Sequence, residues 1–406
     1  MYLSILKSVK MKIKQLYWPV LVVLFLTANS CTNQSQEDVS DEANTTDVQG
    51  KNSERKKVVL PRFPSPAASL EQTIGLSTIK INYSRPSVIS PEGIDRTSRI
   101  WGVLVPYDFN ARPSSSEGKP IPWRAGANEN TTIAFSHDAQ VEGNPIPAGS
   151  YGLHIAIHEA GGATVIFSKK TDAWGSFSYD EADDVLRVEA ETTENEHTPR
   201  LKYSIENVDG TLGRVSLDWE LKRIAFKVAF DTHGMVMTGF EEYLTDTTGL
   251  KGKDYERAAK YCADNNLNLD DGLTWIDLAI ARGESFGSLG VKAQLLVAKG
   301  QTEEAQIVQS QALALPSTTA KNYYSYGTQL LKKGDRKAAQ DIYEKLMTKW
   351  PDEWVAPHGM ARIHSAMGNY DQAIEFEKDA LAKAPDVNKG YIEWAISKLE
   401  KGINFN

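Results

Sequence analysis

The second half of this 406-residue chain repeats small side chains at a spacing of 34 residues. The residues that share this interval are Gly300, Gly334 and Gly368, then Ala305, Ala339 and Ala373, then Ala293, Gly327 and Ala361, and then Ala312, Leu346 and Ala380. A unit of this length accommodates two helices, with small residues where the helices touch and a glycine at the turn between them. One unit cannot bury its apolar face alone, so neighbouring units must stack. The spacing therefore predicts a helical stack over residues 250–406.

This pattern resembles the tetratricopeptide repeat, and Pro351 and Pro385 close two of the units as the family requires. Residues 255–280 resemble a further, degenerate unit, and residues 387–400 are expected to form a capping helix. The resemblance implies an inner helix face that binds a protein or an extended peptide. The residues that it places on this face are Gln294, Tyr324, Thr328, His358, Arg362 and Ser365. A short stack that only buttresses the preceding domain is the alternative.

A period of two residues governs the chain from about 63 to 232. Apolar and polar side chains alternate at residues 79–83, 151–157 and 224–230, and turn signals such as Gly161-Gly162 separate the runs. Short alternating strands without intervening helices indicate an antiparallel β-sandwich or jelly-roll-like domain. The predicted fold class is therefore a β domain, residues 63–249, followed by an α-helical repeat domain, residues 250–406.

Five motifs within the β domain support a second resemblance. They are Tyr83-Ser84-Arg85-Pro86-Ser87, Trp101-Gly102-Val103-Leu104-Val105-Pro106-Tyr107, Trp123-Arg124-Ala125-Gly126-Ala127-Asn128-Glu129, Pro147-Ala148-Gly149-Ser150-Tyr151-Gly152-Leu153 and Trp174-Gly175. Over about residues 65–230 the chain is similar to a bacterial envelope family, the domain of unknown function 2911. The resemblance implies a domain that is often followed by tetratricopeptide-like repeats, and it implies no activity.

The motifs contribute the candidate ligand-binding residues of the β domain. These are Arg85, Tyr107, Trp123, Arg124, Asn128, Glu129 and Trp174. An aromatic face beside a guanidinium group and hydrogen-bonding side chains suits a sugar or a small anion. Two alternatives stay open. One is a carbohydrate-active or other hydrolytic enzyme, or a carbohydrate-binding protein, with its site at Trp123–Glu129. The other is a buried pair of Arg124 and Glu129 that only fixes a long loop.

The sequence predicts no catalytic residue, metal site or cofactor. It contains no Gly-x-Ser-x-Gly, no phosphate-binding Gly-Lys-Ser/Thr loop and no His-Glu-x-x-His. His154 and His158 are four residues apart on a predicted strand, about 13 Å along it, which is too far for one zinc ion. We expect both histidines on a solvated strand face.

Charge excludes one class of partner. The chain has 45 basic and 53 acidic residues, a net charge of −8, which argues against nucleic acid. Eight acids cluster between Asp180 and Glu196, where Arg187 is the one base. A solvated acidic edge is the expected structure of this stretch, and a cation-binding loop is the alternative.

The N-terminal segment predicts the cellular location of the protein. Residues 1–30 carry four lysines before an apolar run, Leu16–Leu26, which is too short to span a bilayer, and so resemble an export signal. Residues 26–31 resemble the lipobox of bacterial lipoproteins and end in Cys31, the expected lipidation site; cleavage near Ser30 without lipidation is the alternative. Residues 31–62 are polar and are expected to be a disordered tether. Cys262 is expected to be a small buried apolar residue.

These features together predict an exported, membrane-anchored lipoprotein of the cell envelope, on the periplasmic or surface side of the outer membrane. Its expected role is that of a binding or scaffold protein. The helical repeats would engage a protein or peptide partner, and the β domain would offer a small-ligand site. Membrane contact would be made through the lipid at Cys31.

Overall fold

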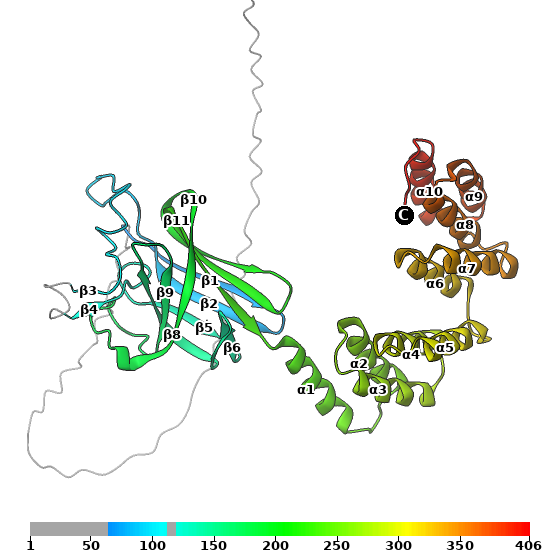
Figure 1. The fold of residues 1–406 in the computed structure, drawn as a ribbon, viewed down its shortest axis with the longest axis horizontal. Coiled ribbons are helices and arrows are strands. Elements are labelled where there is room, and N and C mark those ends of the chain that lie inside the picture. The colour runs from blue at the N-terminus through cyan, green and yellow to red at the C-terminus, as the bar shows by residue number, and fades with distance from the viewer. Residues whose placement is uncertain (1–63, 112–118) are drawn as a thin grey trace, which may run out of the picture. The chain divides into compact units, whose positions relative to one another are not determined.

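The computed structural model describes residues 64–111 and 119–406 (Figure 1). The predicted export signal, Cys31 and the tether up to residue 62 lie outside the described residues. Within the part of the chain that the structure describes, no helix is both long and apolar enough to cross a membrane.

The first part is the predicted antiparallel β domain. Its strands are β1 (Ala67–Ile74), β2 (Ser77–Ser84), β3 (Asn110–Ala111), β4 (Pro120–Ile121), β5 (Thr131–Phe135), β6 (Ala139–Val141), β7 (Asn144–Ile146), β8 (Gly149–Ile157), β9 (Ala163–Ser168), β10 (Asp184–Asn207) and β11 (Leu212–Phe230). Nine of them form one sheet in the order β1-β2-β5-β8-β9-β10-β11-β6-β7, and β3 pairs with β4. A short 3-10 helix, Glu181–Asp183, precedes β10.

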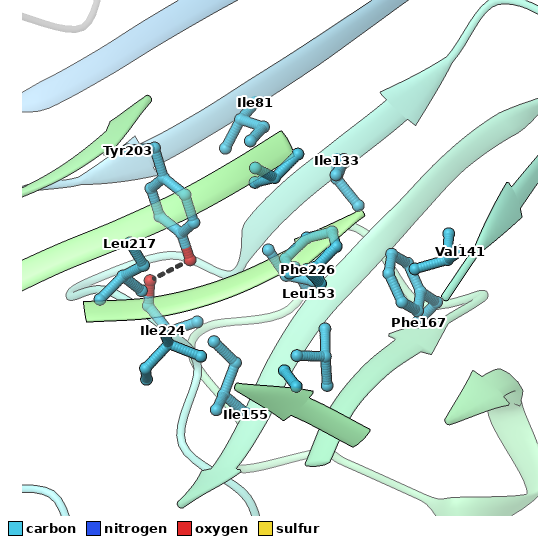
Figure 2. Packing of buried hydrophobic residues seen from close by; sticks show 14 of the residues in the cluster. Ile81, Ile133, Val141, Leu153, Ile155, Phe167, Tyr203, Leu217, Ile224 and Phe226 are labelled. Atoms are coloured by element: carbon cyan, nitrogen blue, oxygen red, sulfur yellow. Dashed lines mark hydrogen bonds between the residues drawn. The ribbon is translucent and has the colours of Figure 1, made fainter. Parts of the chain in front are cut away.

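The long strands β10 and β11 carry the sheet from one layer to the next. Residues 184–190 of β10 pair with β9, whereas residues 191–207 pair with β11. Residues 228–230 of β11 then pair with β6. One apolar cluster contains side chains from β1, β2, β5, β6 and β8–β11, and Figure 2 shows several of them meeting. The sheet therefore folds over a single core, as in a sandwich.

Strand β2 shows the alternation that the sequence predicts, because Ile79, Ile81 and Tyr83 are buried between exposed Lys80 and Asn82. Strand β8 does not. Every residue from Tyr151 to Ile157 is buried, since other segments cover its second face.

The prediction of a solvated face for His154 is therefore wrong. Its side chain is 3% exposed and lies beside Ser176 and Tyr179, which belong to the segment after β9. His158, four residues further along the chain and just past the end of β8, keeps 30% of its side chain exposed.

The second part is helical, as predicted. Its helices are α1 (Thr232–Thr245), α2 (Gly252–Asn265), α3 (Leu269–Arg282), α4 (Phe286–Ala298), α5 (Thr302–Ala314), α6 (Ala320–Lys332), α7 (Arg336–Lys349), α8 (Val355–Met367), α9 (Tyr370–Lys383) and α10 (Asp386–Leu399). Helices α2 to α9 form four consecutive pairs, of which α2–α3 is the degenerate unit, and α10 is the expected capping helix. Helix α1 falls in a stretch where the sequence predicted no helix.

The 34-residue spacing reflects the contacts between helices. Ala305, Ala339 and Ala373 are all at most 4% exposed, and the turn glycines have φ values of 80° to 85°. The tightest contact involves Tyr343 of α7, which is fully buried between Gly327 of α6 and Gly359 of α8. A Cβ atom on either glycine would lie 2.5 to 2.6 Å from the Tyr343 ring.

We expect Gly327→Ala to destabilise the helical domain by about 1–3 kcal/mol, because the new methyl group would overpack the Tyr343 ring. Gly390→Ala is the matched control, since Gly390 lies in α10 with no atom within 4 Å of an added Cβ. There alanine should raise stability by up to about 1 kcal/mol through helix propensity. Urea denaturation measures both changes, and a Gly327→Ala protein as stable as the wild type would contradict the packing argument.

Candidate functional site

A cleft of about 230 Å³ lies in the β domain beside the Trp123 motif. Its lining residues are Pro64, Ser65, Pro86, Pro91, Arg96, Leu104, Val105, Trp123, Arg124, Gly126, Ala127, Asn128 and Trp219. Trp123, Arg124 and Asn128 are thus the predicted ligand residues that the structure brings together here. No carboxylate is among these lining residues.

Three tryptophans support one side of the cleft. The rings of Trp123 and Trp219 stack with centroids 6.0 Å apart, and Trp101 meets both edge-on at 5.9 and 5.8 Å. The indole N–H of Trp101 donates to Glu220 (3.1 Å). Trp219 is 1% exposed, so it belongs to the core and fixes the plane of Trp123.

The loop that carries Trp123 is held by its own polar groups. The Trp123 indole donates to the carbonyl of Gly126 (3.2 Å), and an Arg124 nitrogen donates to the carbonyl of Asn128 (2.7 Å). The Asn128 amide donates in turn to the carbonyl of Ser65 (3.1 Å), with φ of 60° at Asn128. The carbonyl of Ala125 accepts from the buried Tyr203 hydroxyl, the bond that is dashed in Figure 2.

Gly175 explains why the Trp-Gly motif belongs with the Arg124 motif. Gly175 has a φ of 65°, and a Cβ there would lie 2.5 Å from the Arg124 guanidinium carbon. The guanidinium group also lies 5.2 Å from the centroid of the Phe177 ring. Any side chain at position 175 would therefore displace the Arg124 guanidinium group. Glycine has no Cβ and leaves this space free.

The other predicted ligand residues are not among the residues that line this cleft. Arg85 donates to the carbonyl of Leu201 (2.8 Å), the Tyr107 ring packs on Gly102, and Trp174 is 54% exposed.

Glu129 is exposed and lines a different hollow, together with residues 67–69 of β1 and residues 82–84 of β2. A buried Arg124–Glu129 pair, the structural alternative considered from the sequence, is therefore wrong.

Acidic side chains of the stretch 180–196 form ion pairs with Arg187. Asp184 accepts from Arg187 (2.7 Å) and from the Tyr179 hydroxyl (2.7 Å), and Glu181 lies 3.1 Å from Arg187. Among residues 64–111 and 119–406, no group of three or more His, Cys, Asp or Glu side chains is placed to hold a metal ion. The cation-binding alternative gains no support from this geometry.

The inner helix face gathers most of the predicted partner-binding residues. Arg362 of α8 donates to the Tyr324 hydroxyl of α6 (3.0 Å), and Thr328 lies 3.1 Å from the Tyr343 hydroxyl. Burial raises the pKa of Tyr343 to about 12. Gln294 lies on α4, where its amide approaches Asp264 of α2 (3.4 Å).

His358 and Ser365 differ from the other predicted residues because they are buried, at 0% and 1% exposed. His358 Nδ1 lies 2.8 Å from Glu377 of α9, and burial raises the pKa of this carboxyl group. His358 Nε2 and Glu377 Oε2 have no hydrogen-bond partner among the described residues. The His358 ring is enclosed by aromatic rings, at 5.5 Å from Tyr324 and 5.7 Å from Tyr391.

Sequence reasoning missed several residues at both places. In the β domain it missed Trp219 and Phe177, and in the helical domain Glu377, Tyr391 and the segment 403–406, which contacts Arg362 and Ser365. Tyr391 and Trp394 fall within residues 387–400, which the sequence predicted only as a capping helix, although each is 45% exposed and their rings stack at 5.6 Å.

Comparison with known proteins agrees with both parts. Residues 65–228 match a family model described as a protein of unknown function, DUF2911. Residues 330–391, from the end of α6 to the start of α10, match a tetratricopeptide repeat model. The chain combines a DUF2911 domain with tetratricopeptide repeats. No curated protein matches the chain.

Similar solved structures include TTC0263, a thermophilic TPR protein in Thermus thermophilus, with 18% identity, a TM-score of 0.30 and coverage of 42% of this chain and 91% of that one. YrrB, described as a TPR protein with an unusual peptide-binding site, has 16% identity, a TM-score of 0.26 and coverage of 40% and 84%. MamA from Desulfovibrio magneticus has 18% identity, a TM-score of 0.26 and coverage of 38% and 90%. The repeat assignment itself rests on the 34-residue period, the helix pairs and the family model.

The DUF2911 domain should lose stability in acid through His154. Burial, with a smaller contribution from the nearby Arg124 charge, lowers the pKa of His154 to about 4 from a usual 6.5. Between these two pKa values the unfolded chain binds a proton at His154 that the folded state does not. The free energy of unfolding is therefore fully retained above pH 6.5 and falls as the pH drops from 6.5 through 4. We expect the free energy of unfolding to fall by on the order of 3 kcal/mol over this interval.

In His154→Gln this part of the pH dependence should disappear, whereas His197→Gln, at an exposed position, should keep it. Denaturation at several pH values between 7 and 4 measures the difference. Identical pH profiles for the wild type and His154→Gln would contradict the assignment.

Proposed function

We propose that this protein is a lipoprotein of the bacterial cell envelope that acts as a binding scaffold, and that its tetratricopeptide domain holds a protein or peptide partner on the inner face of α6, α8 and α10. Tetratricopeptide repeats generally bind proteins or peptides on such a face. The observation that carries the proposal is the half-buried contact of Arg362 with Tyr324, which presents a guanidinium group and an aromatic ring from neighbouring helices.

The character of the surface supports a partner recognised by shape and apolar contact. Residues 250–406 contain 20 basic and 21 acidic side chains, whereas residues 63–249 contain 16 and 26. The repeat domain is thus nearly neutral, so long-range attraction contributes little to its association rate. Exposed Tyr391 and Trp394 add aromatic area, and residues of these types often dominate binding energies.

The cleft of the DUF2911 domain does not carry the proposal, because the polar groups that would hold a ligand already bind protein atoms. Arg124 donates to the carbonyl of Asn128, Asn128 donates to that of Ser65, and Arg96 donates to that of Val88. The small-ligand site stays a prediction. The hydrolytic alternative at Trp123–Glu129 is disfavoured, since Glu129 lines a separate hollow.

Partner capture tests the proposal. The full chain, used as bait in envelope extracts, should lose its partner when Tyr324→Ala and Arg362→Ala are combined, with recovery falling about 10-fold or more. Arg336→Ala is the control, since Arg336 begins α7 and is exposed. Quantitative mass spectrometry of the captured proteins measures recovery. If deletion of residues 250–406 removes no captured protein, the scaffold function is refuted.

The lipid anchor is proposed from residues 26–31 and has its own test. Cys31→Ala should move the protein from the membrane fraction to the soluble fraction, because no acyl chain can then be attached. Cys262→Ala is the control: Cys262 is a buried free thiol in α2 whose pKa is raised to about 11 by burial. Immunoblots of both fractions measure the shift, and membrane association of Cys31→Ala equal to the wild type would exclude the anchor.

A further inference from the structure

Residues 403–406 turn back from α10 onto the inner face of the repeat domain. Gly402 has a φ of 69° and donates from its backbone N–H to the carbonyl of Leu399 (2.8 Å), which ends the helix. Ile403 then donates to the carbonyl of Lys398 (3.0 Å). Figure 1 shows the chain returning to the side of α8 and α10.

Three consecutive side chains of this segment are recognised individually. The Asn404 amide oxygen accepts from the Ser365 hydroxyl (2.8 Å), which also accepts from the backbone N–H of Phe405 (3.3 Å). Phe405 is 6% exposed, with its ring centroid 5.9 Å from that of His358. The Asn406 amide accepts from Arg362 Nε (2.9 Å) and donates to the Arg362 carbonyl (2.9 Å).

The contact with Arg362 selects an amide side chain. The Asn406 side chain meets the Nε donor and the backbone carbonyl acceptor of Arg362, and an amide carries both complementary groups. A carboxylate would satisfy Nε but would face the Arg362 carbonyl with no proton to donate. The contact at the Arg362 carbonyl is therefore complementary to an amide and not to a carboxylate.

The contacted residues are the ones that tetratricopeptide proteins use for partners. Tyr324, His358, Arg362 and Ser365 were placed on the inner face from the sequence alone, and the segment 404–406 touches His358, Arg362 and Ser365. The exposed fractions of His358 and Ser365, 0% and 1%, are those with residues 404–406 packed against them. A short stretch of the chain thus lies where a bound peptide would lie.

We propose that residues 404–406 occupy in cis the site at which the repeat domain binds its partner, and that the partner presents an extended segment of the same chemistry, an aromatic side chain flanked by amide side chains. This inference rests on the proposed function, because it names the ligand class of the same face. The protein's own segment and the partner then exclude one another.

The exposed pair of Tyr391 and Trp394 gives a partner its advantage. Tyr391 lies 5.7 Å from His358, so the aromatic surface continues beyond the place that Phe405 fills. Residues 404–406 leave both rings 45% exposed. A longer segment can contact these rings as well, and this additional contact allows it to displace residues 404–406.

A peptide of sequence Lys-Gly-Ile-Asn-Phe-Asn, labelled with a fluorophore, is the probe. Self-occupancy reduces apparent affinity by the fraction of open sites, so a site closed in about nine molecules of ten weakens binding roughly 10-fold. We expect full-length Phe405→Ala to bind the peptide about 10-fold more tightly than the wild type in fluorescence anisotropy. Ile403→Ala, at a position 45% exposed, should bind it as the wild type does.

Asn406→Asp is a second variant, which leaves Phe405 in place and removes the amide donor to the Arg362 carbonyl and to Asn404 Oδ1. It should also bind the peptide more tightly than the wild type. If circular dichroism shows that Phe405→Ala does not fold, Asn406→Asp alone tests the inference. Peptides with alanine for phenylalanine, or aspartate for the last asparagine, should bind Phe405→Ala at least about 10-fold more weakly. Folded variants that bind the peptide no better than the wild type overturn the inference.

Partner capture separates this inference from the proposed function. If Tyr324→Ala with Arg362→Ala loses the partner while Phe405→Ala captures no more of it than the wild type, the scaffold function stands and the cis occupancy is refuted. If Phe405→Ala binds the peptide tightly but no inner-face variant changes capture, the site is real and the scaffold function fails.

Discussion

The inner face of the repeat domain depends on the contact of one ring with two glycines. Tyr343 is buried between Gly327 and Gly359, and any side chain at these positions would force α6 or α8 away from α7. The distance between α6 and α8 in turn sets whether Arg362 can reach Tyr324. Interiors are close-packed, so a shift at the ring is transmitted rather than absorbed. The geometry of this inner face is therefore fixed from behind, by the buried Tyr343 ring.

The DUF2911 domain uses the same principle with other side chains. Trp101, Trp123 and Trp219 fix one another through ring contacts, and Gly175 leaves room for the Arg124 guanidinium. Motifs that are far apart in the sequence are therefore parts of one packed unit. Their arrangement explains the run of motifs without requiring a ligand.

The sequence predicts what is periodic and fails where a contact is made across long distances along the chain. The interval of 34 residues identified the helix contacts at Ala339 and Gly327, and alternation identified β2. Alternation at Val215, Leu217 and Trp219 places Trp219 on one face of β11, but it does not show that this ring packs against Trp101 and Trp123, which are far away along the chain. The burial of His154 depends on a segment more than twenty residues away. Residues 404–406 are too few and too polar to form any recognisable pattern.

The direct passage from sheet to helices has a mechanical consequence. Asp231 alone separates the end of β11 at Phe230 from the start of α1 at Thr232. β11 is hydrogen-bonded to strands on both edges, β10 and β6. A pull on the helices would enter the β domain at the pairing of residues 228–230 with β6, before it reaches the longer pairing with β10, which ends at Ala225. Resistance to such a pull is set by the rate at which these ladders rupture and not by the equilibrium stability of the domain.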